Sequence, residues 1–318
     1  MVQFLLRRLL FAIVLVLLTS SSALLLARLA PGDMTAQLGP FASRAEVEST
    51  RERFDLDRSP IAQWWLWVSR AVRLDFGDSF LYNRPVAPLV ARAAANTALL
   101  GVVSLVVATI VGISFGIFTG VRGSGLLPSL VRAASLVCVS MPPLLTSLLF
   151  VFIAARTGWL PAGGMTSAAA SSASWSTWIA DVLRHLPLPA MALALPIAAT
   201  FERLQSQTMA EAVHQPFVLA AVARGVPRRR LILRHAWPVS VRPICAVYGL
   251  AVGALLSGSF IVEFVTAWPG LGRLMYEGLR ARDIYLVAAC ASTGAAFLAL
   301  GTMVGDLLRA AADPRVKE

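Results

Sequence analysis

Six long stretches of this sequence contain no charged residue, and they constrain the fold more than any other feature. They cover residues 9–27, 93–121, 133–155, 186–201, 243–262 and 284–305. A helix that crosses a bilayer needs about 20 mainly apolar residues, and only helices and closed barrels satisfy every backbone polar group there. The short stretch 186–201 reaches this length if Glu202 and Arg203 extend to the membrane interface. We therefore predict an all-α integral membrane protein with six transmembrane helices.

The basic residues lie at particular junctions between these stretches, which indicates the orientation of the chain. The formal net charge is +11 and 14% of the residues are charged, against about 25% in soluble domains. Basic residues precede the first stretch, separate the second from the third and the fourth from the fifth, and follow the sixth. They are Arg7, Arg8, Arg122, Arg132, Arg224, Arg228, Arg229, Arg230, Arg234, Arg242, Arg309, Arg315 and Lys317. Because positive charge marks the cytoplasmic side, both termini are expected there, and no nucleic-acid binding is expected.

Residues 31–92 form the longest polar segment, which this topology places outside the cytoplasm. The segment contains Trp64, Trp65 and Trp67 in an amphipathic pattern. Tryptophan favours the membrane–water interface, so the segment either lies along the outer surface or forms a small cap packed on its own tryptophans. The expected organisation is a first helix with this segment (1–92), a core of five helices with a cytoplasmic loop at 201–243 (93–311), and a tail (312–318).

Glycines and prolines in the predicted helices indicate close packing and bends. Gly112, Gly116 and Gly120 share one face of the second helix, and Gly249 and Gly253 share one face of the fifth. Small residues four apart let two helices approach closely in lipid, as either a static or a moving interface. Kinks are expected at five prolines, namely Pro142, Pro143, Pro187, Pro189 and Pro196.

The sequence contains no motif for catalysis, a cofactor or a metal. A phosphate-binding loop needs Lys followed by Ser or Thr, whereas Lys317 is the only lysine and Glu318 follows it. The cysteines and histidines lack metal-ligand spacing, so we expect a non-catalytic membrane subunit. An ion-coupled carrier or a channel subunit remains the alternative. Its ionisable candidates, Glu263 and Asp306, lie near helix ends, where they are expected to reach the interface or cap the helix.

The segment "FVLAAVARGVPRRRLILRHAWP" (217–238) interrupts the membrane-length pattern. It begins with an apolar helix of about two turns, too short to cross a bilayer. Gly225 is expected to end this helix with a positive φ, and Pro227 suits the first turn of a second one. An apolar helix in the cytoplasm needs a covering surface, and the alanines let another protein approach the backbone closely. We therefore expect a cytoplasmic protein partner at this segment.

Here the sequence resembles the inner-membrane permeases of binding-protein-dependent ABC importers. Their signature reads E-A-A, three residues, Gly, nine residues, then I-x-L-P, and Ala220, Ala221, Gly225 and Pro238 fall on it. Leu219, His235 and Trp237 depart from it. The dipeptide, oligopeptide and nickel branch is also echoed elsewhere along the chain. The echoes are "RLAPGD" (28–33), "LDFGDSFLYNRPV" (74–86), "GWLPAGGM" (158–165), "LPAMALALPIAA" (188–199), "VEFVTAWPGLGRL" (262–274) and "ADPRV" (312–316).

The resemblance implies a type I ABC importer permease fold in the bacterial inner membrane. It further implies that the 217–225 segment seats in a cytoplasmic ATPase. The contacting residues would be Phe217, Val218, Ala220, Ala221 and Arg224, with Gly225 as the turn. The implied partners are a second permease, two ATPase subunits, an external substrate-binding protein and membrane lipid, with no cofactor. The cargo stays open among dipeptides, oligopeptides, nickel and related solutes.

Overall fold

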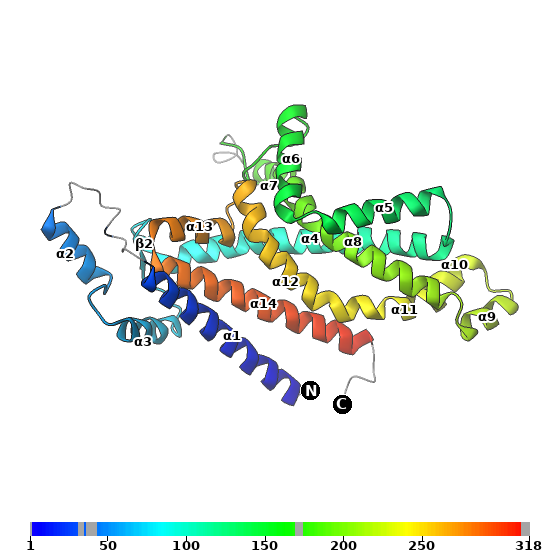
Figure 1. Cartoon of the computed structure of the whole chain (residues 1–318), viewed down its shortest axis with the longest axis horizontal. Helices are drawn as coiled ribbons and strands as arrows, with labels where there is room; N and C mark the ends of the chain where they lie inside the picture. Colours follow the sequence, from blue (N-terminus) through cyan, green and yellow to red (C-terminus); the bar gives the residue numbers. More distant parts are fainter. Residues whose placement is uncertain (1, 31–34, 36–42, 169–173, 313–318) are drawn as a thin grey trace. The chain divides into compact units, whose positions relative to one another are not determined.

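The computed structural model describes residues 2–30, 35, 43–168 and 174–312, and these are almost entirely helical (Figure 1). The first half contains α1 (Val2–Leu29), α2 (Arg44–Arg53), α3 (Pro60–Ala71), β1 (Asp78–Ser79), β2 (Arg84–Pro85), α4 (Val86–Arg122), α5 (Leu126–Ser140) and α6 (Pro143–Thr157). The second half contains α7 (Trp175–His185), α8 (Pro187–Ala212), α9 (Pro216–Ala223), α10 (Arg228–Arg230), the π-helix η3 (Leu231–Ala236), α11 (Trp237–Ser240), α12 (Arg242–Val265), α13 (Leu271–Ala281) and α14 (Ile284–Ala312). The antiparallel pair β1–β2 is a minimal hairpin. The all-α prediction is confirmed.

The helices provide between four and six membrane spans among the described residues. Four are continuous, within α1, α4, α12 and α14. Two more exist if each of the bent pairs α5–α6 and α7–α8 counts as one span, with bends of 108° and 42°. The sharper bend lies at Pro142 and Pro143, where Met141 is extended (φ −84°, ψ 119°), because a residue before proline avoids the helical conformation. The kinks expected there and at Pro187 are therefore present, whereas α8 continues through Pro189 and Pro196.

Two acidic residues expected near helix ends, Glu202 and Glu263, are buried inside the protein. Because α8 extends to Ala212, Glu202 is an interior position of this helix, and it is buried. Glu263 lies near the end of α12, as expected, but it is also fully buried. The expectation that Glu202 reaches the interface is wrong, since its buried side chain accepts a hydrogen bond from Thr119 of α4. For Glu263 burial excludes an interfacial side chain, and the alternative role as a helix cap stays a prediction. Arg203 is exposed, as expected.

The chain divides into two compact units, each with its own core. Unit 1 comprises residues 1–98 and 269–299, and unit 2 comprises residues 99–268 and 300–318. The helices α4 and α14 each contribute to both units. This division follows packing, whereas the division at residues 92 and 311 concerns the sides of the membrane and stays a prediction.

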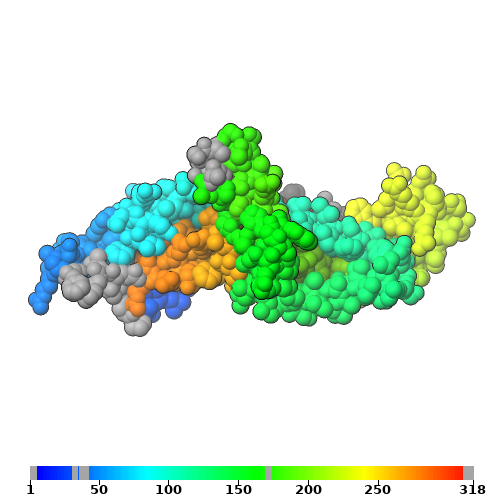
Figure 2. Space-filling view, turned by 90° about the horizontal axis from the view of Figure 1, so that it is seen from above, coloured from blue at the N-terminus to red at the C-terminus, as the bar shows by residue number. Residues whose placement is uncertain are grey.

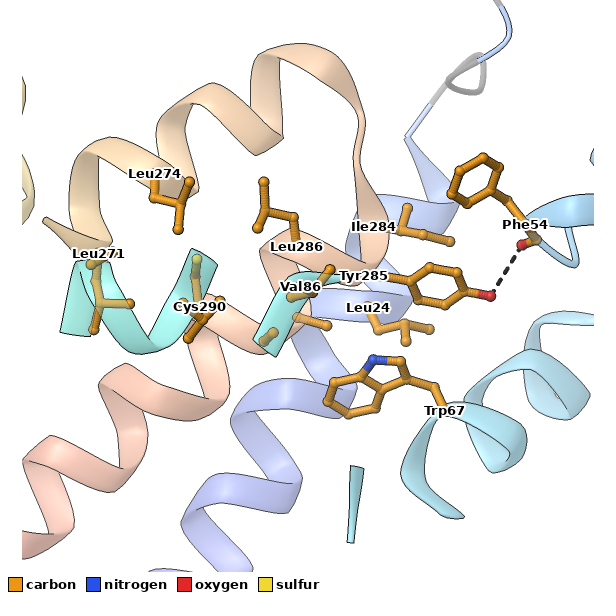
Figure 3. Close-up of a cluster of buried hydrophobic side chains, with 14 of the residues drawn as sticks. Leu24, Phe54, Trp67, Val86, Leu271, Leu274, Ile284, Tyr285, Leu286 and Cys290 are labelled. Carbon is orange, nitrogen blue, oxygen red and sulfur yellow. Dashed lines mark hydrogen bonds between the residues drawn. The ribbon is translucent and has the colours of Figure 1, made fainter. Parts of the chain in front are cut away.

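The core of unit 1 joins α1, α3, α13 and the start of α14 (Figure 3). Trp67 is buried in this core beside Leu24. The Trp64 indole N–H donates to Ser21 Oγ at 2.6 Å, whereas Trp65 is exposed. The Tyr285 hydroxyl donates to the Phe54 carbonyl oxygen at 3.1 Å. Trp67 is therefore a core residue and Trp65 a surface residue, and the position of this segment along the outer membrane surface stays a prediction.

Asp283 ties the β-hairpin to the first turn of α14 within unit 1. Its buried carboxylate accepts hydrogen bonds from Ser79 Oγ (2.6 Å), the Leu81 N–H (3.1 Å) and the Leu286 N–H (3.1 Å). The Leu286 bond caps the helix, because an aspartate before the first turn accepts from the third residue. Burial raises the pKa of the Asp283 carboxyl above its usual value, against the opposite effect of these bonds.

Replacing Asp283 by Ala is expected to destabilise unit 1 by about 2–4 kcal/mol, because three donors, two of them buried, lose their acceptor. The thermal unfolding midpoint of the full chain in detergent measures this. The matched control is Asp57→Ala, which removes an exposed carboxylate paired with Arg51 at 2.8 Å and should change stability by less than about 0.5 kcal/mol. Equal midpoints for the two variants would contradict the role assigned to Asp283.

Candidate functional site

The segment from α9 to α11 joins α8 to α12 in unit 2, and α9 and α10 lie at one end of its longer helices (Figures 1 and 2). Pro216 is the first residue of α9, where its missing N–H leaves no bond unmade. At the other end the Gly225 N–H donates to the Val222 carbonyl at 2.9 Å, and the Val226 N–H donates to the Ala221 carbonyl at 3.2 Å. These paired bonds close the helix with Gly225 in the left-handed conformation (φ +75°). The short helix therefore has defined ends.

One face of α9 is buried against this chain's own residues. Val218 is 0% exposed and Ala221 is 1% exposed, and residues three apart lie on the same side of a helix. They pack in a cluster with four other buried side chains, Met209, Ala212, Leu231 and Ala236. This cluster fixes α9 against the end of α8 and the start of the returning chain.

The opposite face of α9 is apolar and exposed. Phe217, Leu219 and Val222 are 45%, 54% and 55% exposed, and Ala220, Arg224 and Gly225 are exposed as well. We call this surface, formed by Phe217, Leu219, Ala220, Val222 and Arg224, the outward face of α9. Apolar side chains grouped on an exposed surface are typical of an interaction site.

The structure thus divides the six residues expected to form the docking segment, five as contacts and Gly225 as the turn. Val218 and Ala221 point into the chain, so their expected outward contacts are corrected, whereas Phe217, Ala220, Arg224 and Gly225 remain accessible. Sequence reasoning missed Leu219 and Val222, which lie three residues apart on the exposed side. Their spacing was the available signal, but an all-apolar helix has no polar side to show which face is buried.

The return from α10 to α12 contains the π-helix η3. The Trp237 N–H donates to the Ile232 carbonyl, five residues earlier, and Pro238 has no N–H to donate to Arg234, so a regular α-helical turn is interrupted here. Leu231 and Ala236, at the two ends of η3, belong to the cluster under α9. The exposed arginines of this stretch are Arg228, Arg229, Arg230 and Arg234.

The glycines of α4 lie directly against α8. A Cβ on Gly112 would stand 2.6 Å from the Ala198 carbonyl oxygen, one on Gly116 would stand 2.5 Å from Gln205 Cβ, and one on Gly120 would stand 2.6 Å from the Ser206 carbonyl oxygen. Distances below 3.0 Å leave no room for a side chain. The two backbones are therefore as close as the spacing of four suggests.

The glycines of α12 are less crowded than those of the helix they face. A Cβ on Gly249 would meet Thr302 Cα at 3.5 Å, an ordinary contact, and Gly253 is half-buried. In α14, by contrast, a Cβ on Gly301 would stand 2.1 Å from Val252 Cγ1, and one on Gly305 would stand 2.7 Å from the Gly249 backbone nitrogen. Sequence reasoning missed Gly301 and Gly305, although they show the same spacing of four.

Comparison with known protein families identifies the family of this chain. The family described as "Binding-protein-dependent transport system inner membrane component" matches residues 112–318, and its N-terminal counterpart matches residues 1–80. The first match covers more than half of the chain, including the whole of α9–α11. The chain belongs to this family of membrane permeases.

Several characterised permeases resemble this one over their whole length. The oligopeptide transport system permease protein OppB of Mycobacterium tuberculosis is 31% identical over 325 residues, covering 100% of this chain and 99% of that protein. The oligopeptide transport system permease protein AppB of Bacillus subtilis is 28% identical over 320 residues, covering 100% of both. The glutathione transport system permease protein GsiC of Escherichia coli is 29% identical over 319 residues, covering 100% of this chain and 99% of the relative.

The family places this permease as a non-catalytic, multi-pass component of the inner membrane in a binding-protein-dependent ABC importer. Its work therefore depends on other subunits of an importer complex. A component of this kind acts by contacting other subunits and by moving its helices. The outward face of α9 is an accessible apolar surface outside the candidate spans, and it has defined geometry.

Proposed function

We propose that this permease forms half of a translocation pathway for peptides and receives the action of an ATPase through the outward face of α9. The observation that carries the proposal is the division of α9 into a buried face, with Val218 and Ala221, and an exposed apolar face, with Leu219 and Val222. The buried face holds the helix to α8, so a force applied to the exposed face passes into a membrane helix. The printed functions of the relatives, oligopeptide and glutathione transport, support a peptide cargo.

The proposed complex contains a second permease, two ATPase subunits and an external substrate-binding protein, surrounded by membrane lipid. The absence of a phosphate-binding loop from this sequence supports a separate ATPase, since uphill transport needs an energy source. The exposed arginines beside α9 support a cytoplasmic location for this surface. The outer segment, residues 31–92, then faces the binding protein's side of the membrane.

Replacing Leu219 by Asp is expected to abolish most ATPase association, because a charge at a desolvated apolar contact loses its hydration without a partner. The complex, expressed with its neighbouring subunits, is purified through this chain, and the co-purifying ATPase and the ATP-dependent uptake of a labelled dipeptide are measured. We expect each to fall at least about tenfold, which corresponds to about 1.4 kcal/mol of lost contact. The thermal midpoint of the chain alone should stay unchanged, since Leu219 is exposed.

Leu74→Asp is the matched control, because Leu74 is an exposed leucine that belongs to unit 1, in the segment expected outside the cytoplasm, whereas α9 belongs to unit 2. It should retain full ATPase association and uptake. Normal ATPase recovery with Leu219→Asp would contradict docking at α9. Dipeptide uptake without ATP would instead indicate a carrier, and passive flux through the isolated chain would indicate a channel.

A further inference from the structure

A basic stretch without any acidic residue joins α9 to the candidate span in α12. Residues 213–242 contain no aspartate or glutamate, and their six arginines are all exposed; these are Arg224, Arg228, Arg229, Arg230, Arg234 and Arg242. The Arg224 Nε donates to the Ala220 carbonyl at 3.3 Å. Within the part of the chain that the structure describes, the other five side chains form no hydrogen bond or ion pair. Uncompensated positive charge on a surface favours an anionic partner.

The inner side of this stretch is fixed to the rest of unit 2, which determines the residues that point outward. Leu231 and Ala236 are buried in the cluster under α9. The buried Ser240 accepts hydrogen bonds from α8, its Oγ from Gln205 Nε2 at 2.8 Å and its carbonyl from Thr208 Oγ1 at 2.7 Å. The side chains left exposed at spacings of three and four, which suit one helical face, are Arg230, Leu233, Arg234 and Trp237. We call these four residues the α10–α11 surface.

The α10–α11 surface combines charge and apolar area directly beside a span. Leu233 and Trp237 are 45% and 37% exposed. Trp237 lies five residues before Arg242, the first residue of α12, which α11 joins directly (Figure 1). Tryptophan favours the membrane–water interface, and helices that carry arginine together with tryptophan and leucine bind at the headgroup layer. The planar guanidinium of arginine also matches the geometry of a phosphate.

We propose that the α10–α11 surface binds an anionic phospholipid of the leaflet in which α12 begins. Arg230 and Arg234 contact the phosphate of the headgroup, and Leu233 and Trp237 contact the first carbons of the acyl chains. An acidic protein surface would also match the arginines, but lipid is already present where a span begins, and a phospholipid offers phosphate and hydrocarbon side by side. The bound lipid anchors the end of the loop at the membrane surface and leaves α9 free.

The test uses the full-length chain in phosphatidylcholine vesicles and a probe that reports on Trp237 itself. Phosphatidylglycerol brominated near the headgroup end of one acyl chain is added in increasing fractions, and brominated phosphatidylcholine is the reference lipid. The quenching of Trp237 is the difference between the natural chain and Trp237→Phe, which keeps an aromatic ring. We expect a preference for phosphatidylglycerol of at least about tenfold, because two arginines near the surface each attract an anionic lipid.

The double variant Arg230→Gln with Arg234→Gln should lose this preference, so that the two lipids quench Trp237 equally. Its matched control is Arg44→Gln with Arg73→Gln, which removes the same charge from exposed positions of unit 1 and should keep the full preference. Glycerol 3-phosphate in solution separates a lipid from a free phosphate. It should not restore the fluorescence of Trp237, because it lacks the hydrocarbon that Leu233 and Trp237 contact.

Equal quenching by both lipids in the natural chain, or a preference that survives in the double variant, would overturn the inference. Displacement by glycerol 3-phosphate would overturn it in favour of a free-anion site. A double variant that keeps the preference but loses co-purifying ATPase would assign the arginines to a protein partner instead. If the double variant unfolds at a lower temperature than the natural chain, the two single variants decide, each with a loss of at least about threefold. Vesicles without ATPase suffice, so Leu219→Asp should keep the lipid preference whether or not α9 is the docking helix.

Discussion

Replacing Ala221 by Trp is expected to destabilise the loop itself, whereas replacing its neighbour Ala220 by Trp should leave the fold intact and abolish coupling. Ala221 is 1% exposed and packs among Val218, Met209 and Leu231. An indole at this position overfills a packed cluster, at a cost of about 1–3 kcal/mol. Ala220 is exposed, so an indole there projects from the outward face of α9, where it blocks close approach of a partner.

The two variants differ by one position along the same helix, which makes each the control for the other. The measurements are the thermal midpoint of the chain in detergent, the recovery of co-purifying ATPase, and ATP-dependent dipeptide uptake. We expect Ala220→Trp to keep the natural midpoint and to lose at least about tenfold in ATPase recovery and uptake. Ala221→Trp should lower the midpoint as well. Full uptake by Ala220→Trp at normal expression would show that this face receives no partner.

Replacing Gly116 by Ala is expected to disrupt the contact between α4 and α8, although it adds a single methyl group. The new Cβ would stand 2.5 Å from Gln205 Cβ and 2.8 Å from the Glu202 carbonyl oxygen. The Glu202 oxygen belongs to the backbone of α8, so the helices must separate. Such overpacking costs about 1–3 kcal/mol, and separation also strains the hydrogen bond between Thr119 and Glu202. We expect a lower thermal midpoint and little folded protein in the membrane.

Gly294→Ala provides the matched control for this substitution. Gly294 lies inside α14, and a Cβ added there meets no atom within 4 Å in the described structure. Alanine is favoured over glycine inside a helix by about 1 kcal/mol, so the control should be neutral or stabilising. A midpoint for Gly116→Ala equal to that of Gly294→Ala would show that α4 and α8 are not packed as closely as the structure places them. The contact between α4 and α8 would then not limit how these two helices move against each other.

Several features could be predicted from the sequence because they depend on local chemistry. An uncharged apolar stretch of membrane length must form a helix, since lipid offers no other partner for its backbone. The break at Pro142 and Pro143 follows from the missing N–H and the restricted residue before proline. The positive φ at Gly225 follows from its place after a short helix. None of these depends on which residues of other helices lie nearby.

Only the tertiary structure decided which side chains of a helix are buried and which are exposed. In α9 every residue from Phe217 to Ala223 is apolar, so the sequence has no periodicity that separates Val218 and Ala221 from Leu219 and Val222. The same holds for Glu202, whose charge suggested the membrane interface until α4 supplied Thr119 as a partner. In lipid both faces of a helix are apolar, so hydrophobicity determines that a segment spans, and close packing between particular helices determines what each residue contacts.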